Sequence, residues 1–191
     1  QLGRNYTRHM MFSTLAIMPG EVNFHRGTRQ SGFLFDEQYH KPERGFNGGY
    51  LIETVATDPV TVAAAVGGWG ESAAEYLANY TKLGGLWVTG EDPPQATNRI
   101  SFEDSEKDQY GLTVPTLHYR FHETSLAMFE HGKKQCEALL ASMGGQKPVT
   151  TLDVGGGCHN MGVARMSANK NDGVTNRWGQ AHDVDNLFVT D

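Results

Sequence analysis

The amino-acid sequence predicts an α+β fold in which an antiparallel sheet carries helices. Glycine pairs at 48–49, 67–68, 84–85 and 144–145 divide the 191 residues into short units. Such frequent glycine favours tight turns between antiparallel strands over long uninterrupted helices. The exception is an amphipathic segment at 123–143, whose apolar residues recur at helical spacing. Together these patterns indicate short strands and one long helix.

The first half of the chain contains signals for one strand and one helix. Residues 49–55 alternate apolar and polar side chains, which indicates a strand. The segment 59–66 is consistent with either a helix or a strand. Residues 72–83 predict a helix that begins at Ser72 as N-cap and uses Glu75 to complete a capping box.

The second half is richer in strand signals. Short apolar runs predict strands at 86–89, 98–102 and 114–121. The acidic stretch 103–108, which lies between the last two, is expected to be a solvated turn.

The segment 123–143 predicts the longest helix of the chain. Its expected N-cap is Thr124 or Ser125, and its expected C-cap is Gly144. The apolar stripe of this helix is expected to contain Leu126, Phe129, Cys136, Leu139, Leu140 and Met143.

Composition and charge exclude several classes of protein. The net charge of −6 and the pI near 5.7 offer no basic face to a nucleic acid. No apolar run approaches the roughly 18 residues of a membrane span, since the stretch 10–18 is too short and Pro19 follows it. Cys136 and Cys158 do not amount to a disulfide framework. Residues 1–10 lack the apolar core of a secretory signal, and the compartment is left open.

The most unusual stretch of the sequence surrounds His159. Three glycines and Cys158 precede it, so little side-chain bulk separates the backbone from a flat ligand. An imidazole with a pKa of about 6.5 accepts a hydroxyl proton near neutral pH, which makes His159 a candidate general base. The alternative is a structural histidine in a glycine-rich turn. A thiol site built from Cys158 and His159 is geometrically poor, because adjacent residues of an extended chain point to opposite faces.

Other side chains that carry chemistry have simpler interpretations. His118 and His122 have the spacing of a helical zinc pair, but a strand is predicted there, so no metal site is expected. No Gly-x-Gly-x-x-Gly or Gly-Lys-Ser/Thr string is present, so nothing indicates a phosphate-binding loop. The three tryptophans could line a sugar site or serve in packing; they are Trp69, Trp87 and Trp178.

Two strings near the C-terminus resemble the signature of the glucose-methanol-choline (GMC) oxidoreductase family. They are 158–166 (CHNMGVARM) and 176–191 (NRWGQAHDVDNLFVTD). The opening residues 2–9 (LGRNYTRH) resemble the Gly-x-Asn-x-x-x-His segment of the same family. Within the family the resemblance looks closest to the flavoprotein subunit of gluconate 2-dehydrogenase. Val163 departs from the Thr that is usual after Gly162.

This resemblance implies an FAD-dependent enzyme that oxidises a CH–OH group of a sugar, sugar acid or other alcohol. It gives His159 the role of base, and it brings Asn160, Gly162 and Asp191 to the flavin. It also implies a small-molecule alcohol or sugar as substrate, and a cytochrome or small subunit as electron-transfer partner. By analogy with the gluconate branch, a membrane-associated periplasmic complex is an expectation.

The resemblance further implies a domain organisation. Residues 1–150 are expected to form a substrate-binding domain, an antiparallel sheet of about six strands with helices packed on one face. Residues 151–191 are expected to return to an FAD-binding domain that lies mostly outside this chain. A second catalytic residue is expected beyond Asp191, so the fragment alone is expected to be inactive. The alternative function is a non-catalytic carbohydrate-binding or assembly module of the same fold.

Overall fold

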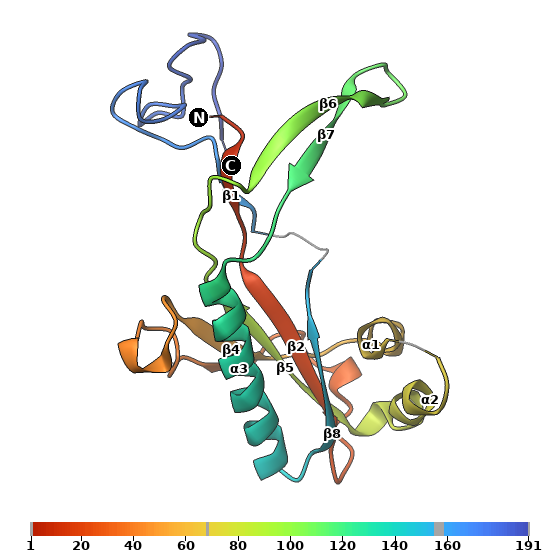
Figure 1. Ribbon diagram of the computed structural model, residues 1–191. Helices are drawn as coiled ribbons and strands as arrows, with labels where there is room; N and C mark the ends of the chain where they lie inside the picture. The colour runs from red at the N-terminus through yellow and green to blue at the C-terminus, as the bar shows by residue number, and fades with distance from the viewer. Residues whose placement is uncertain (1, 68, 155–158, 191) are drawn as a thin grey trace. The chain divides into compact units, whose positions relative to one another are not determined.

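The computed structural model describes residues 2–67, 69–154 and 159–190. Within these ranges the α+β class is confirmed, but the strands form two antiparallel sheets, of four and five strands, instead of one sheet of about six (Figure 1). The chain divides into two compact units. We call residues 9–91 and 123–156 the sheet unit, and residues 1–8, 92–122 and 157–191 the signature unit. Each is described by itself.

The sheet unit is built on five antiparallel strands in the order β3-β4-β5-β2-β8. Their bounds are β2 Met10–Ile17, β3 Phe33–Leu34, β4 Tyr50–Thr54, β5 Leu83–Gly90 and β8 Gln146–Leu152. The expected strands at 49–55 and 86–89 are therefore confirmed, and the second is longer than expected.

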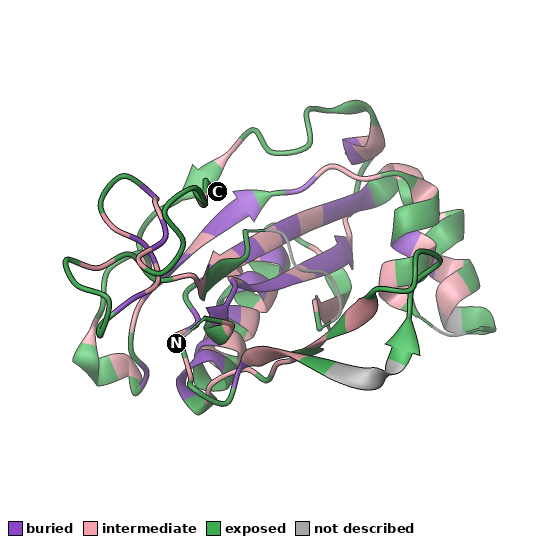
Figure 2. Ribbon diagram, turned by 90° about the horizontal axis from the view of Figure 1, so that it is seen from above, coloured by how far each residue is buried: buried purple, intermediate pink, exposed green. Residues whose placement is uncertain are grey.

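Strand β2 has no counterpart among the predicted strands. It pairs with β5 along its whole length, from Met10 opposite Gly90 to Ile17 opposite Leu83. Side chains on both of its faces are buried, so its sequence is a continuous apolar run without the alternation of a half-exposed strand. Figure 2 shows that buried residues are concentrated along these central strands.

Helix α3 (Glu123–Ser142) packs on one face of the sheet (Figure 1). Its predicted extent is confirmed, but its buried stripe differs from the prediction: Leu126 and Met143 are exposed. The residues that face the sheet include Gly132 and Cys136, whose small size allows close approach. A Cβ at Gly132 would lie 3.0 Å from Phe12 Cζ. The proposed caps Thr124 and Ser125 are buried inside the first turn of the helix instead.

The opposite face of the sheet carries an apolar cluster to which two shorter helices contribute. They are α1 (Pro59–Val66) and α2 (Glu71–Ala78), so helical residues contact both faces and not one. The ambiguous segment 59–66 is thus a helix, capped by Asp58, whose carboxylate accepts from the backbone N–H groups of Val60 and Thr61. The cluster contains Leu15, Phe24, Val55, Val62, Tyr76 and Leu83.

Helix α2 is shorter than the predicted helix at 72–83. Its N-cap is Gly70, so Ser72 is not the cap. It ends at Ala78 because a 3₁₀ turn, η3 (Tyr80–Lys82), follows and β5 begins at Leu83. Two further 3₁₀ turns lie in the sheet unit, η1 (Phe24–Arg26) and η2 (Pro42–Arg44).

The signature unit contains four antiparallel strands in the order β7-β6-β1-β9. Their bounds are β1 Arg4–Thr7, β6 Arg99–Lys107, β7 Thr113–His118 and β9 Met161–Val163. The expected strands at 98–102 and 114–121 are confirmed in part. The acidic stretch was wrongly predicted as a turn, since β6 continues through it to Lys107 and the turn of the hairpin follows.

No helix in the described ranges is both long and apolar enough to cross a membrane. The predicted division into a substrate-binding domain over 1–150 and a signature segment over 151–191 is a statement about function, and it stays a prediction.

Replacing Gly132 by valine tests the close packing of α3. The change removes a glycine from a helix interior, which alone is favourable, but it places two methyl groups against the buried Phe12 ring. Overpacking outweighs the gain in helix propensity, and we expect a loss of about 1–3 kcal/mol in the free energy of unfolding. Urea denaturation followed by circular dichroism measures it.

The matched control is Ala138→Val, on an exposed position of the same helix. It should change the free energy of unfolding by about 0.5 kcal/mol or less. Equal losses in both variants would contradict tight packing at Gly132.

Candidate functional site

A cavity of about 880 Å³ lies within the signature unit. Its volume falls in the range of small-molecule and cofactor sites. Segments from the two ends of the sequence form most of its wall, together with Pro94. The lining residues that the argument uses are Arg4, Asn5, Asn160, Gly162, Arg165 and Thr190.

The two ends of the chain meet in this site because β1 pairs with β9. Arg4 lies opposite Val163, and Thr7 lies opposite Met161, with an irregular register between the two pairs. The backbone N–H of Gly3 also donates to the carbonyl of Val163 at 2.9 Å. The N-terminal segment therefore sets the path of the residues that follow His159.

Gly162 is required by this pairing. Its φ is +89°, and a Cβ there would lie 2.0 Å from the backbone oxygen of Asn5. The next residue, Val163, also has a positive φ of 51°, which is unusual for a β-branched side chain. A three-residue turn accompanies it, in which the N–H of Ala164 donates to the carbonyl of Gly162 at 2.6 Å. Strained backbone of this kind is typical of functional sites.

The structure brings only part of the predicted site together. Asn160 and Gly162 both line the cavity. His159 comes directly before them, is exposed and has a φ of +61°, but it is not among the lining residues. Asp191 and Cys158 lie outside the described residues.

A hydrogen bond across the sheet joins Asn160 to the N-terminal strand. The hydroxyl of Tyr6 donates to Asn160 Oδ1, and the Tyr6 side chain is buried. The resemblance of residues 2–9 to a family segment was the only sequence signal for this contact, and it carried no role for Tyr6. Arg4 and Asn5 were missed for the same reason.

Buried polar side chains hold β1 in place. Thr7 Oγ1 donates to the backbone oxygen of Asp92 at 2.5 Å, and the Asp92 carboxylate accepts from the Tyr119 hydroxyl at 3.0 Å and the His122 N–H at 3.1 Å. Burial first, and then the Asp92 charge, raise the pKa of Tyr119, so this phenol stays protonated. Asn98 is also buried, and its backbone oxygen accepts from the N–H of Tyr6 at 3.0 Å.

The segment after β9 is held by its own hydrogen bonds. Asn176 Oδ1 accepts from the N–H groups of Trp178 and Gln180. The N–H of Val189 donates to the carbonyl of Gly179 at 2.8 Å, and a Cβ at Gly179 would lie 2.6 Å from the Val189 oxygen. These contacts bring residues 189 and 190 back to the cavity wall.

The charge of the cavity wall differs from that of the protein. Arg4 and Arg165 line the cavity, and no Asp or Glu is among its described lining residues, although the chain has a net charge of −6. The wall also combines apolar side chains such as Met161 with backbone and amide groups. A positive, partly apolar cavity with a close backbone approach at Gly162 fits part of an FAD molecule.

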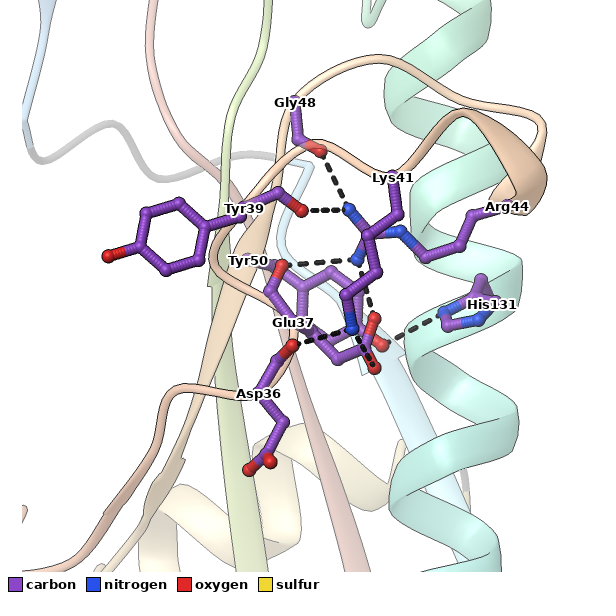
Figure 3. Close-up of polar contacts among 8 residues, drawn as sticks. All are labelled: Asp36, Glu37, Tyr39, Lys41, Arg44, Gly48, Tyr50 and His131. Carbon is purple, nitrogen blue, oxygen red and sulfur yellow. Dashed lines mark hydrogen bonds and ion pairs between the residues drawn. The ribbon is translucent and has the colours of Figure 1, made fainter.

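A second polar cluster lies in the sheet unit, around Arg44 (Figure 3). Its guanidinium donates to Glu37 Oε2 at 2.5 Å and to the backbone oxygens of Glu37, Tyr39 and Gly48. Only 6% of the Arg44 side chain is exposed. These bonds close the loop that joins β3 to β4.

Beside this cluster, the Tyr50 hydroxyl and His131 Nδ1 are 2.9 Å apart (Figure 3). Burial raises the pKa of Tyr50 and lowers the pKa of His131, so both side chains are neutral near pH 7. The pair joins β4 to α3, which gives it a structural role.

The other histidine, cysteine and tryptophan residues that the sequence singled out have structural roles or are exposed, where the structure describes them. His118 lies on β7, where its Nε2 is 2.7 Å from Ser101 Oγ. Groups of three or more His, Cys, Asp or Glu able to hold a metal do not occur within the described ranges. Burial raises the pKa of the free Cys136 thiol to about 12, so it is not a nucleophile. Trp87 packs against the apolar cluster, whereas Trp69 and Trp178 are exposed.

Gly162→Ala tests the close approach of the two chain ends. The methyl group would meet the Asn5 oxygen, and the positive φ adds backbone strain. We expect the free energy of unfolding to fall by about 2–4 kcal/mol. Gly111→Ala is the matched control, because its φ is +81° but nothing lies within 4 Å. Gly111→Ala should show only the cost of the backbone strain. An equal loss of free energy of unfolding in the two variants would contradict the steric role of Gly162.

Arg44→Lys tests the closure of the loop between β3 and β4. Lysine keeps the charge but lacks the planar fork that reaches three backbone oxygens and Glu37. We expect a loss of about 2–4 kcal/mol in the free energy of unfolding. Lys41→Met is the control, because Lys41 is 3.6 Å from Glu37 and half-exposed, and it should cost about 1 kcal/mol or less. Thermal and urea denaturation distinguish the two; a tolerated Arg44→Lys would refute the role.

Comparison with known proteins agrees with the resemblance at the level of the family. The chain is 28% identical over 204 residues to 2-methyl-1,2-propanediol dehydrogenase of Mycolicibacterium austroafricanum; the alignment covers 97% of this chain and 36% of that protein. The chain thus spans little more than a third of the length of this curated relative. The gluconate 2-dehydrogenase branch stays a prediction. The family model described as GMC oxidoreductase matches residues 94–191, more than half of the chain and the whole of the signature segment, and the chain belongs to that family.

Proposed function

We propose that this chain is the substrate-facing part of a flavin-dependent oxidoreductase that oxidises a CH–OH group. The observation that carries the proposal is the positive, partly apolar cavity formed by the family signature and β1. The GMC oxidoreductase family is generally FAD-dependent, and the cavity wall fits part of this cofactor. The relative is by name a dehydrogenase of a small diol, which supports a hydroxylated substrate.

The proposed reaction divides an alcohol oxidation between the cofactor and this chain. When bound, FAD supplies the acceptor for the hydride that leaves the substrate carbon. The hydroxyl proton goes to His159, and the loss of hydride and proton leaves the substrate as a carbonyl compound. His159 is exposed, so its imidazole can accept this proton and pass it to water. Asn160 and Gly162, in the cavity wall, hold the cofactor.

The substrate in this proposal is a small alcohol, with sugars, sugar acids and diols as the classes to test. The electrons leave by way of a cytochrome or small subunit, as in the gluconate branch that the sequence resembles. Rapid re-oxidation of the reduced protein by oxygen alone would contradict this last part.

The test is bleaching of bound flavin by substrate in the full-length protein. The wild type should be yellow and should bleach with at least one alcohol from a panel of diols, sugars, sugar acids and choline. His159→Gln should retain flavin but slow its reduction by about 100-fold or more, because a general base contributes about 10²–10⁴ to the rate.

The control is His182→Gln, a histidine of the same segment whose Nε2 is 3.2 Å from Ser167 Oγ. It should change the rate of bleaching by less than about threefold. A colourless, well-folded full-length protein would instead favour the non-catalytic module. Unchanged bleaching in His159→Gln would show that His159 is structural.

A further inference from the structure

Tyr6 is the side chain that links the N-terminal strand to the residue after the proposed base. Its hydroxyl donates to Asn160 Oδ1, across 154 positions of sequence. Asn160 lines the cavity and His159 precedes it. The contact therefore joins a buried scaffold residue to the part of the site that faces the ligand.

Tyr6 itself has little freedom to move. The residue is 6% exposed, and its ring packs edge-on against Tyr119 with the centroids 5.5 Å apart. Its N–H donates to the carbonyl of Asn98, a residue that is 1% exposed. A buried donor held by a ring contact and a backbone hydrogen bond provides a fixed point for its acceptor.

The residues that depend on this fixed point have an unusual backbone. His159 has a φ of +61°, in the left-handed region that few non-glycine residues adopt, although histidine does so more often than most. Such a conformation persists only where surrounding contacts maintain it. Because the Tyr6 hydroxyl donates to Oδ1, the bond also favours one orientation of the Asn160 carboxamide.

We propose that Tyr6 is a positioning residue of the alcohol oxidation, acting through Asn160 on the placement of His159. The inference rests on the proposed function. It assigns the phenol no chemical step: Tyr6 transfers no proton and touches no substrate. Its effect on the rate arises because a base misplaced by about 1 Å can slow a reaction by as much as 10²-fold.

The experiment is a double-mutant cycle in the flavin-loaded full-length protein. The variants are Tyr6→Phe, Asn160→Ala and the pair, and the readout is the rate of flavin reduction at saturating substrate. Tyr6→Phe should slow reduction by about tenfold, with flavin retained and KM changed by less than about threefold. The double variant should be no slower than Asn160→Ala alone, because both remove the same bond.

The control is Tyr119→Phe, which removes another buried phenol hydroxyl of the signature unit, the one bonded to Asp92. It should lower the melting temperature while changing the rate of flavin reduction by less than about twofold. This separates loss of stability from loss of placement.

Three outcomes overturn the inference. The first is reduction at the wild-type rate in Tyr6→Phe. The second is multiplication of the two single effects in the double variant. The third concerns Asn160→Ala, which serves as the test if Tyr6→Phe does not fold, because Asn160 is exposed and its replacement should be tolerated. Reduction at the wild-type rate in Asn160→Ala would also overturn the inference. Absence of bleaching in the wild type would instead reject the proposed function.

Discussion

The pairing of β1 with β9 is the constraint on which the signature unit depends. It joins residues 4–7 to residues 161–163, so the site exists only when two segments far apart in the sequence have met. Closing so long a loop costs conformational entropy, and the positive φ of Val163 adds strain. The pairing survives because β1 lies between β6 and β9 and its side chains are anchored in buried polar contacts.

Those contacts make β1 a rigid template for the signature strand. Asn98 uses its backbone oxygen for Tyr6 and its carboxamide for both backbone groups of Arg120. The Asp92 carboxylate accepts hydrogen bonds from Thr7, Tyr119 and the backbone N–H of His122. Every one of these groups is satisfied, which is the condition under which buried polar residues increase order. A site whose backbone is strained needs this kind of support.

Sequence patterns predicted several elements correctly, but they missed a strand that is buried on both faces and mistook part of β6 for a turn. The strand at 50–54 and the extent of α3 were predictable, but β2 was missed because its apolar run shows no period. The stripe of α3 was partly wrong because Gly132, which has no side chain, lies at the point of closest approach. In the site, a local motif indicated Asn160 and Gly162. Tyr6 and Arg4 could not be assigned, since no local pattern records which strand pairs with β9.

The electrostatics of the cavity follow from the same pairing. Arg4 comes from β1 and Arg165 from the segment after β9, and each alone would be an ordinary surface cation in an acidic protein. Brought together without a described carboxylate in the cavity wall, they produce a local positive potential that the net charge of −6 conceals. Such a potential favours ligands that carry or develop negative charge. A flavin that receives a hydride is a ligand of this kind, so the pairing that brings Asn160 to Tyr6 also gives the cavity a charge that suits the proposed reaction.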